Sequence, residues 1–118
     1  MIDITDGTLA WVDVCALSDL TPGRGVCALI DGQQVAIFRF PDDEVYALSN
    51  YDPFSEAYVL SRGVIGSKGD ALKVASPIFK QNFNVKTGVC LDNPDVSVPA
   101  YATQVVDGRV LVSAQPVE

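Results

Sequence analysis

The stretch VCALIDGQQVAIFRFPDDEVYAL, residues 26–48, contains two hairpin signals in succession. Asp31-Gly32 lies between two apolar runs, and this dipeptide suits the positive φ angles of a tight turn. Pro41-Asp42-Asp43 then separates the second run from a third, which ends at Leu48. Because strands joined by such short turns pair with each other, this stretch predicts antiparallel β-structure.

The flanking sequence extends this pattern in both directions. Residues 11–17 alternate in polarity, and Asp107-Gly108 marks another hairpin near the C-terminus. No segment sustains a 3.6-residue period over three helical turns. The chain is therefore predicted to be all-β. Outside the opening stretch, strands are expected at residues 11–17, 71–75, 83–85, 98–106 and 109–113.

Two segments in the middle of the chain lack this regular alternation. Residues 50–60 predict a long loop with at most a short helical turn after Pro53. Residues 62–70 predict the end of a strand that leads into a flexible turn, and a further loop begins at Ser76-Pro77. The prediction is thus of irregular loops held between regular strands.

Length and composition limit the class of protein. The chain has 118 residues, 48% of them hydrophobic and 19% charged, which is typical of one soluble domain over residues 1–118. No apolar run approaches the roughly 20 residues that a membrane-spanning helix needs. The first six residues, MIDITD, lack the basic and apolar regions of a secretory signal. We therefore expect a cytoplasmic protein that does not bind a membrane.

The chain contains no histidine and three cysteines. Histidine is the commonest general base near neutral pH and a frequent ligand of zinc, haem iron and Rieske clusters, so those chemistries are excluded for this chain alone. Cys15, Cys27 and Cys90 are widely spaced, and we expect buried, reduced thiols. Nothing marks a catalytic residue. This favours a binding or subunit module over a self-sufficient enzyme.

The net charge of −7 disfavours binding to nucleic acid, because a phosphate backbone would be repelled. Basic residues are nevertheless concentrated between Arg62 and Cys90, where five of them stand against Asp70 alone. This basic stretch is either a solvent-exposed strand face or a docking surface for an acidic partner.

The irregular segments resemble the two ligand loops of Rieske iron–sulfur domains. The first loop of that family carries Cys-Pro-His, and the matching tripeptide here is Asp52-Pro53-Phe54, followed by Leu60-Ser61-Arg62-Gly63. The second loop carries Cys-Pro-x-His, and the match is Ser76-Pro77-Ile78-Phe79, followed by a Thr87-Gly88 turn. The resemblance implies a Rieske-like fold of stacked antiparallel sheets, with two loops in the former cluster-binding positions.

All four iron ligands are replaced in this chain. Asp52 and Ser76 stand where the family has cysteine, and Phe54 and Phe79 stand where it has histidine. Carboxylate, hydroxyl and phenyl groups do not reproduce two thiolates and two imidazoles, so we expect no [2Fe–2S] cluster and no other cofactor or metal here. We expect the two phenyl rings to face each other and to join the loops by apolar contact.

This combination of replaced ligands is similar to the small subunits of assimilatory NADH-dependent nitrite reductases. The matching motifs are Asp-Pro-Phe-Ser at 52–55, Ser-Arg-Gly at 61–63 and the Lys-Gln pair at 80–81, and the resemblance extends over residues 11–112. It implies an accessory subunit that is not catalytic on its own. Its partner would be a large subunit that holds FAD, a [4Fe–4S] cluster and sirohaem and reduces nitrite to ammonium.

We predict the partner surface at the two loop tips and the adjoining basic stretch. The residues expected there are Tyr51, Phe54, Arg62, Lys80 and Gln81. Phe54 has an alternative role as a core residue. Two other functions also stay open at this point. One is a ferredoxin-like redox carrier, which requires a cluster, and the other is a ligand-free Rieske-like interaction module of another redox complex.

Overall fold

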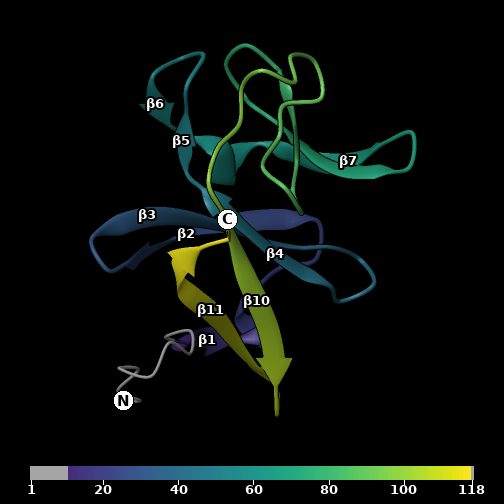
Figure 1. Ribbon diagram of the computed structural model, residues 1–118. Helices are drawn as coiled ribbons and strands as arrows, with labels where there is room; N and C mark the ends of the chain where they lie inside the picture. The colour runs from purple at the N-terminus through teal and green to yellow at the C-terminus, as the bar shows by residue number, and fades with distance from the viewer. Residues whose placement is uncertain (1–10, 118) are drawn as a thin grey trace.

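The computed structural model describes residues 11–117, which form three antiparallel sheets and two short 3₁₀ helices (Figure 1). The elements are β1 (Trp11–Ala16), η1 (Leu17–Asp19), β2 (Arg24–Ile30), β3 (Gln33–Arg39), β4 (Val45–Ser49), β5 (Tyr51–Asp52), β6 (Ala57–Tyr58), η2 (Leu60–Arg62), β7 (Val64–Lys68), β8 (Ala71–Ala75), β9 (Asn82–Asn84), β10 (Ala100–Val106) and β11 (Arg109–Pro116). The first six residues, on which the expectation of a cytoplasmic location rests, lie outside this described range. Among the described residues, no helix is long and apolar enough to cross a membrane.

The large sheet contains the strands that the hairpin signals predicted. Its order is β1-β11-β10-β4-β3-β2, whereas β7-β8-β9 form a second sheet and β5 pairs with β6. Strand β3 lies inside the molecule with both faces buried: Val35 and Ile37 face one core, and Ala36 and Phe38 face the other. This explains its continuous apolar run, since a strand covered on both sides has no solvent-facing positions.

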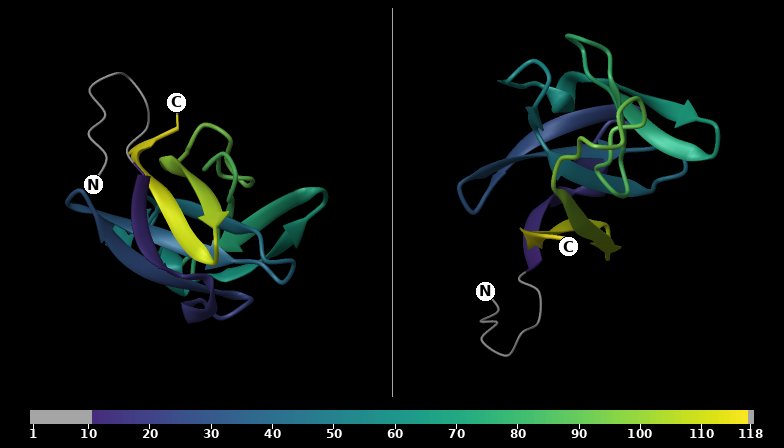
Figure 2. Two further views of the ribbon diagram at one scale, coloured as in Figure 1. Left: turned by 90° about the horizontal axis from the view of Figure 1, so that it is seen from below. Right: turned by 45° about the horizontal axis from the view of Figure 1, so that its top comes forward.

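The three-stranded sheet packs over the face of the large sheet that carries Phe38. Val74 of β8 and Phe83 of β9 share a core with Phe38. Glycine permits the close approach: a Cβ atom on Gly25 would lie 2.7 Å from the Phe38 ring, and one on Gly63 would lie 2.3 Å from a carbonyl oxygen of β8. The small sheets therefore lie on one side of β3 and β4, and β1, β10 and β11 lie on the other (Figure 2). This stacked, all-β arrangement confirms the predicted fold class.

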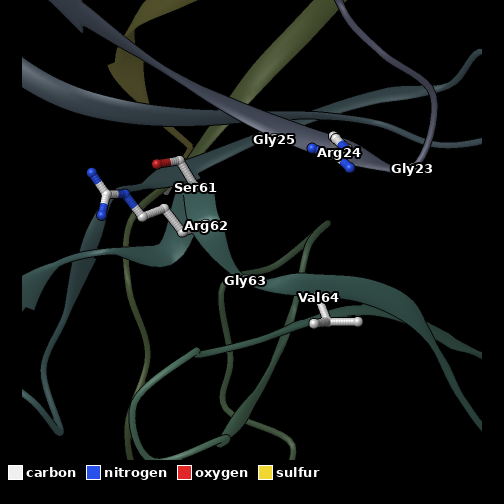
Figure 3. Close-up of a pocket in the computed structure, with 7 residues that line it drawn as sticks. All are labelled: Gly23, Arg24, Gly25, Ser61, Arg62, Gly63 and Val64. Carbon is white, nitrogen blue, oxygen red and sulfur yellow. The ribbon is translucent and has the colours of Figure 1, made fainter.

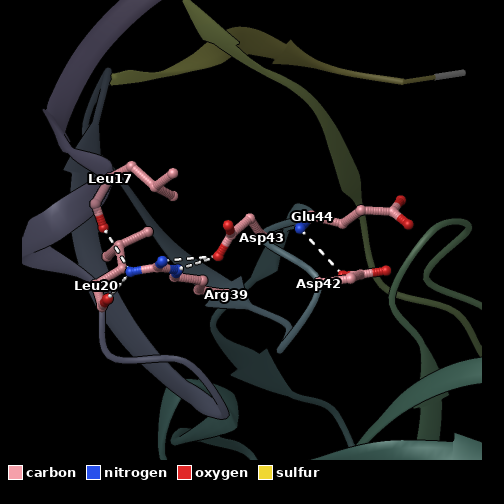
Figure 4. A network of polar contacts seen from close by, with 6 residues as sticks. All are labelled: Leu17, Leu20, Arg39, Asp42, Asp43 and Glu44. Carbon is pink, nitrogen blue, oxygen red and sulfur yellow. Dashed lines mark hydrogen bonds and ion pairs between the residues drawn. The ribbon is translucent and has the colours of Figure 1, made fainter.

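Arg39 links the β3–β4 hairpin to the η1 turn (Figure 4). Its guanidinium group donates hydrogen bonds to the carbonyl oxygens of Leu17 and Leu20, at 3.2 and 2.8 Å, and forms an ion pair of 2.7 Å with Asp43. In the same turn, the backbone N–H of Glu44 donates to Asp42 Oδ1 at 3.1 Å. The adjacent acids of this hairpin therefore stabilise a turn.

The middle of the chain is more regular than we predicted. Residues 51–58 form the β5–β6 hairpin, where we predicted a loop over 50–60. The rings of Tyr51 and Tyr58 pack across it with centroids 5.1 Å apart and planes inclined at 59°. The 3₁₀ helix η2 follows this hairpin, in place of the helical turn expected directly after Pro53. The segment predicted as a strand end over 62–70 contains the complete strand β7, which pairs with β8 along its whole length.

Candidate functional site

Asp52 and Ser76 bring the two ligand-like loops into direct contact. Asp52 ends β5, and Ser76 directly follows β8. The two residues are only 0% and 1% exposed. The Ser76 hydroxyl donates a hydrogen bond of 2.5 Å to Asp52 Oδ2. The positions that resemble the cysteine ligands are thus joined by a buried hydrogen bond.

The same two side chains also shape their own loops. Asp52 Oδ1 accepts a hydrogen bond from the backbone N–H of Phe54 at 2.9 Å, and Oδ2 accepts one from the Ser55 hydroxyl at 2.8 Å. On the second loop, the Ser76 hydroxyl accepts one from the backbone N–H of Ile78 at 3.3 Å. Side chains that bond to the backbone two residues ahead fix a turn locally. Each loop is therefore shaped by the residue that also joins it to the other.

The hydrogen bonds around Asp52 favour its charged form. Burial is the largest single influence on this carboxyl group and by itself raises the pKa. The hydroxyl groups of Ser76 and Ser55, with the backbone N–H groups of Phe54 and Ser55, more than offset it, so the pKa lies below its ordinary value of 3.8. The buried negative charge is stabilised by hydrogen-bond donors that point at it.

The two phenylalanines at the histidine-like positions do not face each other, which corrects our expectation. Phe54 packs against the core, with its ring centroid 6.0 Å from that of Phe83. Phe79 is 59% exposed, and its neighbour Ile78 is 47% exposed. Lys80 follows with a positive φ of 63°, which turns the chain at this point. The tip of the second loop therefore presents apolar side chains to the outside, and the buried hydrogen bond joins the loops.

The side chains at the four ligand positions do not fit a [2Fe–2S] cluster. A Rieske centre needs two thiolates on one iron and two imidazoles on the other. Asp52 and Ser76 are hydrogen-bonded to each other, and the phenyl groups of Phe54 and Phe79 have no lone pair to donate to iron. Over residues 11–117, no group of three or more His, Cys, Asp or Glu side chains is arranged to hold a metal ion.

The cysteines differ in exposure, although all three were expected to be buried. Cys90 is buried in the core, Cys15 is half-buried, and Cys27 is exposed. Cys27 is the middle residue of β2, the edge strand in which Val26 and Leu29 are also exposed. Desolvation raises the pKa of the Cys15 and Cys27 thiols. Both therefore stay protonated near neutral pH and lack the thiolate character of a reactive cysteine.

The residues predicted at the partner surface have different environments. The ring of Tyr51 packs against that of Tyr58 in the β5–β6 hairpin, and Lys80 is exposed on the second loop. Gln81 is half-buried, and its Oε1 atom is buried with no hydrogen-bond partner in the described part of the chain. Phe54 is half-buried against the core, which supports the alternative role considered for it.

Arg62 lies at a depression between the large sheet and the small sheets (Figure 3). The depression has a volume of about 440 Å³. Arg24 of β2 lines one wall, and Arg62 of η2 lines the other (Figure 3). Arg24 was not among the predicted site residues, because it follows an ordinary turn and no local signal connects it with Arg62. Only the packing of η2 over β2 brings these two residues to one depression.

The comparisons with known proteins agree with this structure. A family model described as "Rieske-like [2Fe-2S] domain" matches residues 10–113. The nitrite reductase (NADH) small subunit of Salmonella typhimurium is 50% identical over 101 residues, which cover 85% of this chain and 94% of that protein. The chain belongs to the Rieske-like family of nitrite reductase small subunits. The solution structure of the nitrite reductase [NAD(P)H] small subunit from Erwinia carotovora has 49% identity and a TM-score of 0.76, and the match covers 92% of this chain and 84% of that one.

A longer relative contains a similar domain. The nitrite reductase [NAD(P)H] large subunit of Klebsiella oxytoca is 39% identical to this chain over 105 residues, which cover 89% of this chain and 11% of that protein. In this family, the small-subunit domain therefore occurs both as a separate chain and as a segment of a large-subunit chain. The resemblance described from the loop motifs is confirmed.

Proposed function

We propose that this chain is the accessory small subunit of an NADH-dependent nitrite reductase whose large subunit reduces nitrite to ammonium. The observation that carries the proposal is the match to small subunits over nearly their whole length. The similar segment within the Klebsiella large-subunit chain supports a position beside the catalytic chain. The loops without iron ligands support a role other than electron transfer.

In this proposal, the reaction takes place on cofactors of the large subunit, namely FAD, a [4Fe–4S] cluster and sirohaem. Cofactors supply the redox chemistry in such enzymes, and protein supplies orientation and exclusion of water. The small subunit acts indirectly, by fixing an arrangement of large-subunit domains or by shielding a cofactor from solvent. The complex is proposed to work in the cytoplasm, where NADH is available.

The loop tips are the proposed contact with the large subunit. Ile78 and Phe79 present exposed apolar surface, and Lys80 and Arg62 add positive charge. Within residues 11–117, neither of these two cations has an ion-pair partner. Apolar groups beside unpaired cations suit a partner surface with an apolar centre and an acidic rim. The buried Asp52–Ser76 bond behind the tips keeps this surface in one shape.

An activity assay tests the proposed function. Nitrite consumption and ammonium formation with NADH would be measured for the cofactor-loaded large subunit, with and without an equimolar amount of this chain. We expect this chain alone to be inert, and we expect the large subunit to turn over faster when it is added. An unchanged rate, with no complex formed in the same mixture, would contradict the proposal.

A pair of charge variants tests the proposed contact surface. Arg62→Gln combined with Lys80→Gln should weaken binding to the large subunit about five- to tenfold at low salt, with a smaller effect at high salt. The matched control, Gln104→Glu combined with Gln115→Glu, changes the net charge by the same amount at exposed positions of β10 and β11. Equal weakening by both double variants would indicate a general charge effect and would contradict this surface.

A further inference from the structure

Strand β2 forms one edge of the large sheet. Within the described part of the chain, no strand pairs with its outer side. Its seven residues, Arg24–Ile30, pair with β3 in one continuous register. Two of its apolar side chains reach the surface: Val26 is 37% exposed, and Leu29 is 74% exposed. An edge strand of this kind presents unpaired backbone N–H and C=O groups to its surroundings.

This edge lacks the features that usually prevent pairing with another chain. Proteins protect exposed edges with charged residues, prolines and bulges. After Arg24, β2 contains no charge and no proline, and its register has no interruption. The opposite edge, β1, carries Asp13 in an ion pair of 2.9 Å with Arg109, and its register shifts between Asp13 and Cys15. The contrast indicates that the β2 edge is available to a partner.

The depression with two arginines lies at the beginning of the same strand (Figure 3). Arg24 and Gly25 line the β2 side, and Arg62 and Val64 line the other, with Val64 69% exposed. Among residues 11–117, neither arginine has an ion-pair partner. In a chain with a net charge of −7, two such guanidinium groups beside an uncharged edge indicate a partner with carboxylates at this point.

We propose that an extended segment of the large subunit adds to the β2 edge as a further strand and places acidic side chains beside Arg24 and Arg62. Strand addition derives its affinity from backbone hydrogen bonds and its specificity from side-chain contacts. Val26 and Leu29 lie on opposite faces of the sheet, because successive side chains of a strand alternate, so the added strand meets apolar surface on both sides. The proposal rests on the proposed function and extends the contact surface from Arg62 along β2.

A second copy of this chain is the other occupant that the geometry permits. Cys27 is the middle residue of β2, so a symmetric antiparallel pair of β2 strands places the two Cys27 residues opposite each other. The strand that a copy would supply is uncharged between Gly25 and Ile30. An acidic segment of the large subunit therefore complements Arg24 and Arg62 better than a copy does.

Hydrogen–deuterium exchange of the full chain, alone and with the cofactor-loaded large subunit, tests this proposal. We expect the amides of Gly25, Cys27 and Leu29, which point away from β3 in this register, to exchange at least about tenfold more slowly in the complex, because an added strand accepts their hydrogen bonds. Leu29→Lys places a charge on the edge and is expected to weaken the complex about tenfold. The matched control, Val106→Lys, adds the same charge at a 45% exposed residue of β10 and should leave the affinity unchanged.

The outcomes separate this proposal from the proposed function. Unchanged exchange over residues 25–29 in a complex that still forms would overturn strand addition and leave the proposed function intact. No complex at all would overturn both. Protection of β2 in the chain alone, with a doubled mass and a Cys27–Cys27 cross-link under mild oxidation, would assign the edge to a second copy and overturn the choice of the large subunit.

Discussion

Replacing Ser76 with alanine removes the buried hydrogen bond that joins the two loops. Asp52 keeps its bonds to Ser55 and to the Phe54 N–H, but Oδ2 loses the donor from the second loop. A hydrogen bond to a charged group contributes about 1.5–3 kcal/mol, and solvent does not reach this site to replace it. A loss of 1 kcal/mol lowers the Tm of a domain of this size by about 4 °C, so Ser76→Ala should lower it by about 6–12 °C.

Thermal unfolding followed by circular dichroism measures this effect. Ser67→Ala, at an exposed serine of β7, is the matched control and should shift the Tm by less than about 1 °C. A double-mutant cycle with Asp52→Asn isolates the pair, and we expect a coupling free energy of about 1 kcal/mol or more. A Tm of Ser76→Ala equal to that of the control would refute the conclusion that this bond holds the loops together.

Side chains around the loops and the β3–β4 hairpin lead to three more predictions. Phe54→Ala should lower the free energy of unfolding by about 2 kcal/mol, because the Phe54 ring packs against the core. Phe79→Ala should lower it by less than about 0.5 kcal/mol, because the Phe79 ring is mostly exposed. Urea unfolding of the two variants and the wild type measures both values. The pKa of Asp52 is lower in the folded protein than its ordinary value of 3.8, which applies to the unfolded chain. The ionised carboxylate therefore stabilises the fold above pH 3.8, and this stabilisation is lost as the pH falls through the pKa of the folded protein. Urea unfolding at about pH 5 and pH 2.5 should therefore show a larger loss in the wild type than in Asp52→Asn. Burial and the hydrogen bond to Glu44 raise the pKa of Tyr46 to about 12. The stability that this shift contributes is therefore present below pH 10 and is lost as the pH rises through 12. Because Tyr46 stays protonated at pH 11, the phenolate absorbance at that pH should be nearly equal in the wild type and Tyr46→Phe.

The predicted strands were those with local signals. Asp31-Gly32 and Asp107-Gly108 determine their turns almost alone, since both residues of each pair have positive φ angles. The β5–β6 hairpin was missed because its strands have two residues each and depend on the packing of Tyr51 against Tyr58. Strand β7 was predicted only as the end of a strand before a turn, because Val64–Lys68 shows little alternation in polarity. Pairing with β8 along its whole length completes the strand.

The site was predicted in position but not in chemistry. The loop motifs assigned Asp52 and Ser76 to equivalent positions of two loops, and the structure joins them by a hydrogen bond. A carboxylate opposite a hydroxyl is a complementary pair that could have been recognised. We paired the two phenylalanines across the loops and treated Asp52 and Ser76 only as lost ligands. The direction of Phe79 depends on the positive φ of Lys80, and a sequence does not specify that angle for a lysine.

The Asp52–Ser76 bond also changes how this protein matures. Where iron joins two loops, the free energy of metal binding is part of the free energy of folding, so the chain reaches its final shape only after a cluster has been delivered. Here the connection is made by side chains that are present as soon as translation ends. The connection between these two loops therefore forms without a supply of iron and sulfide and without cluster assembly proteins.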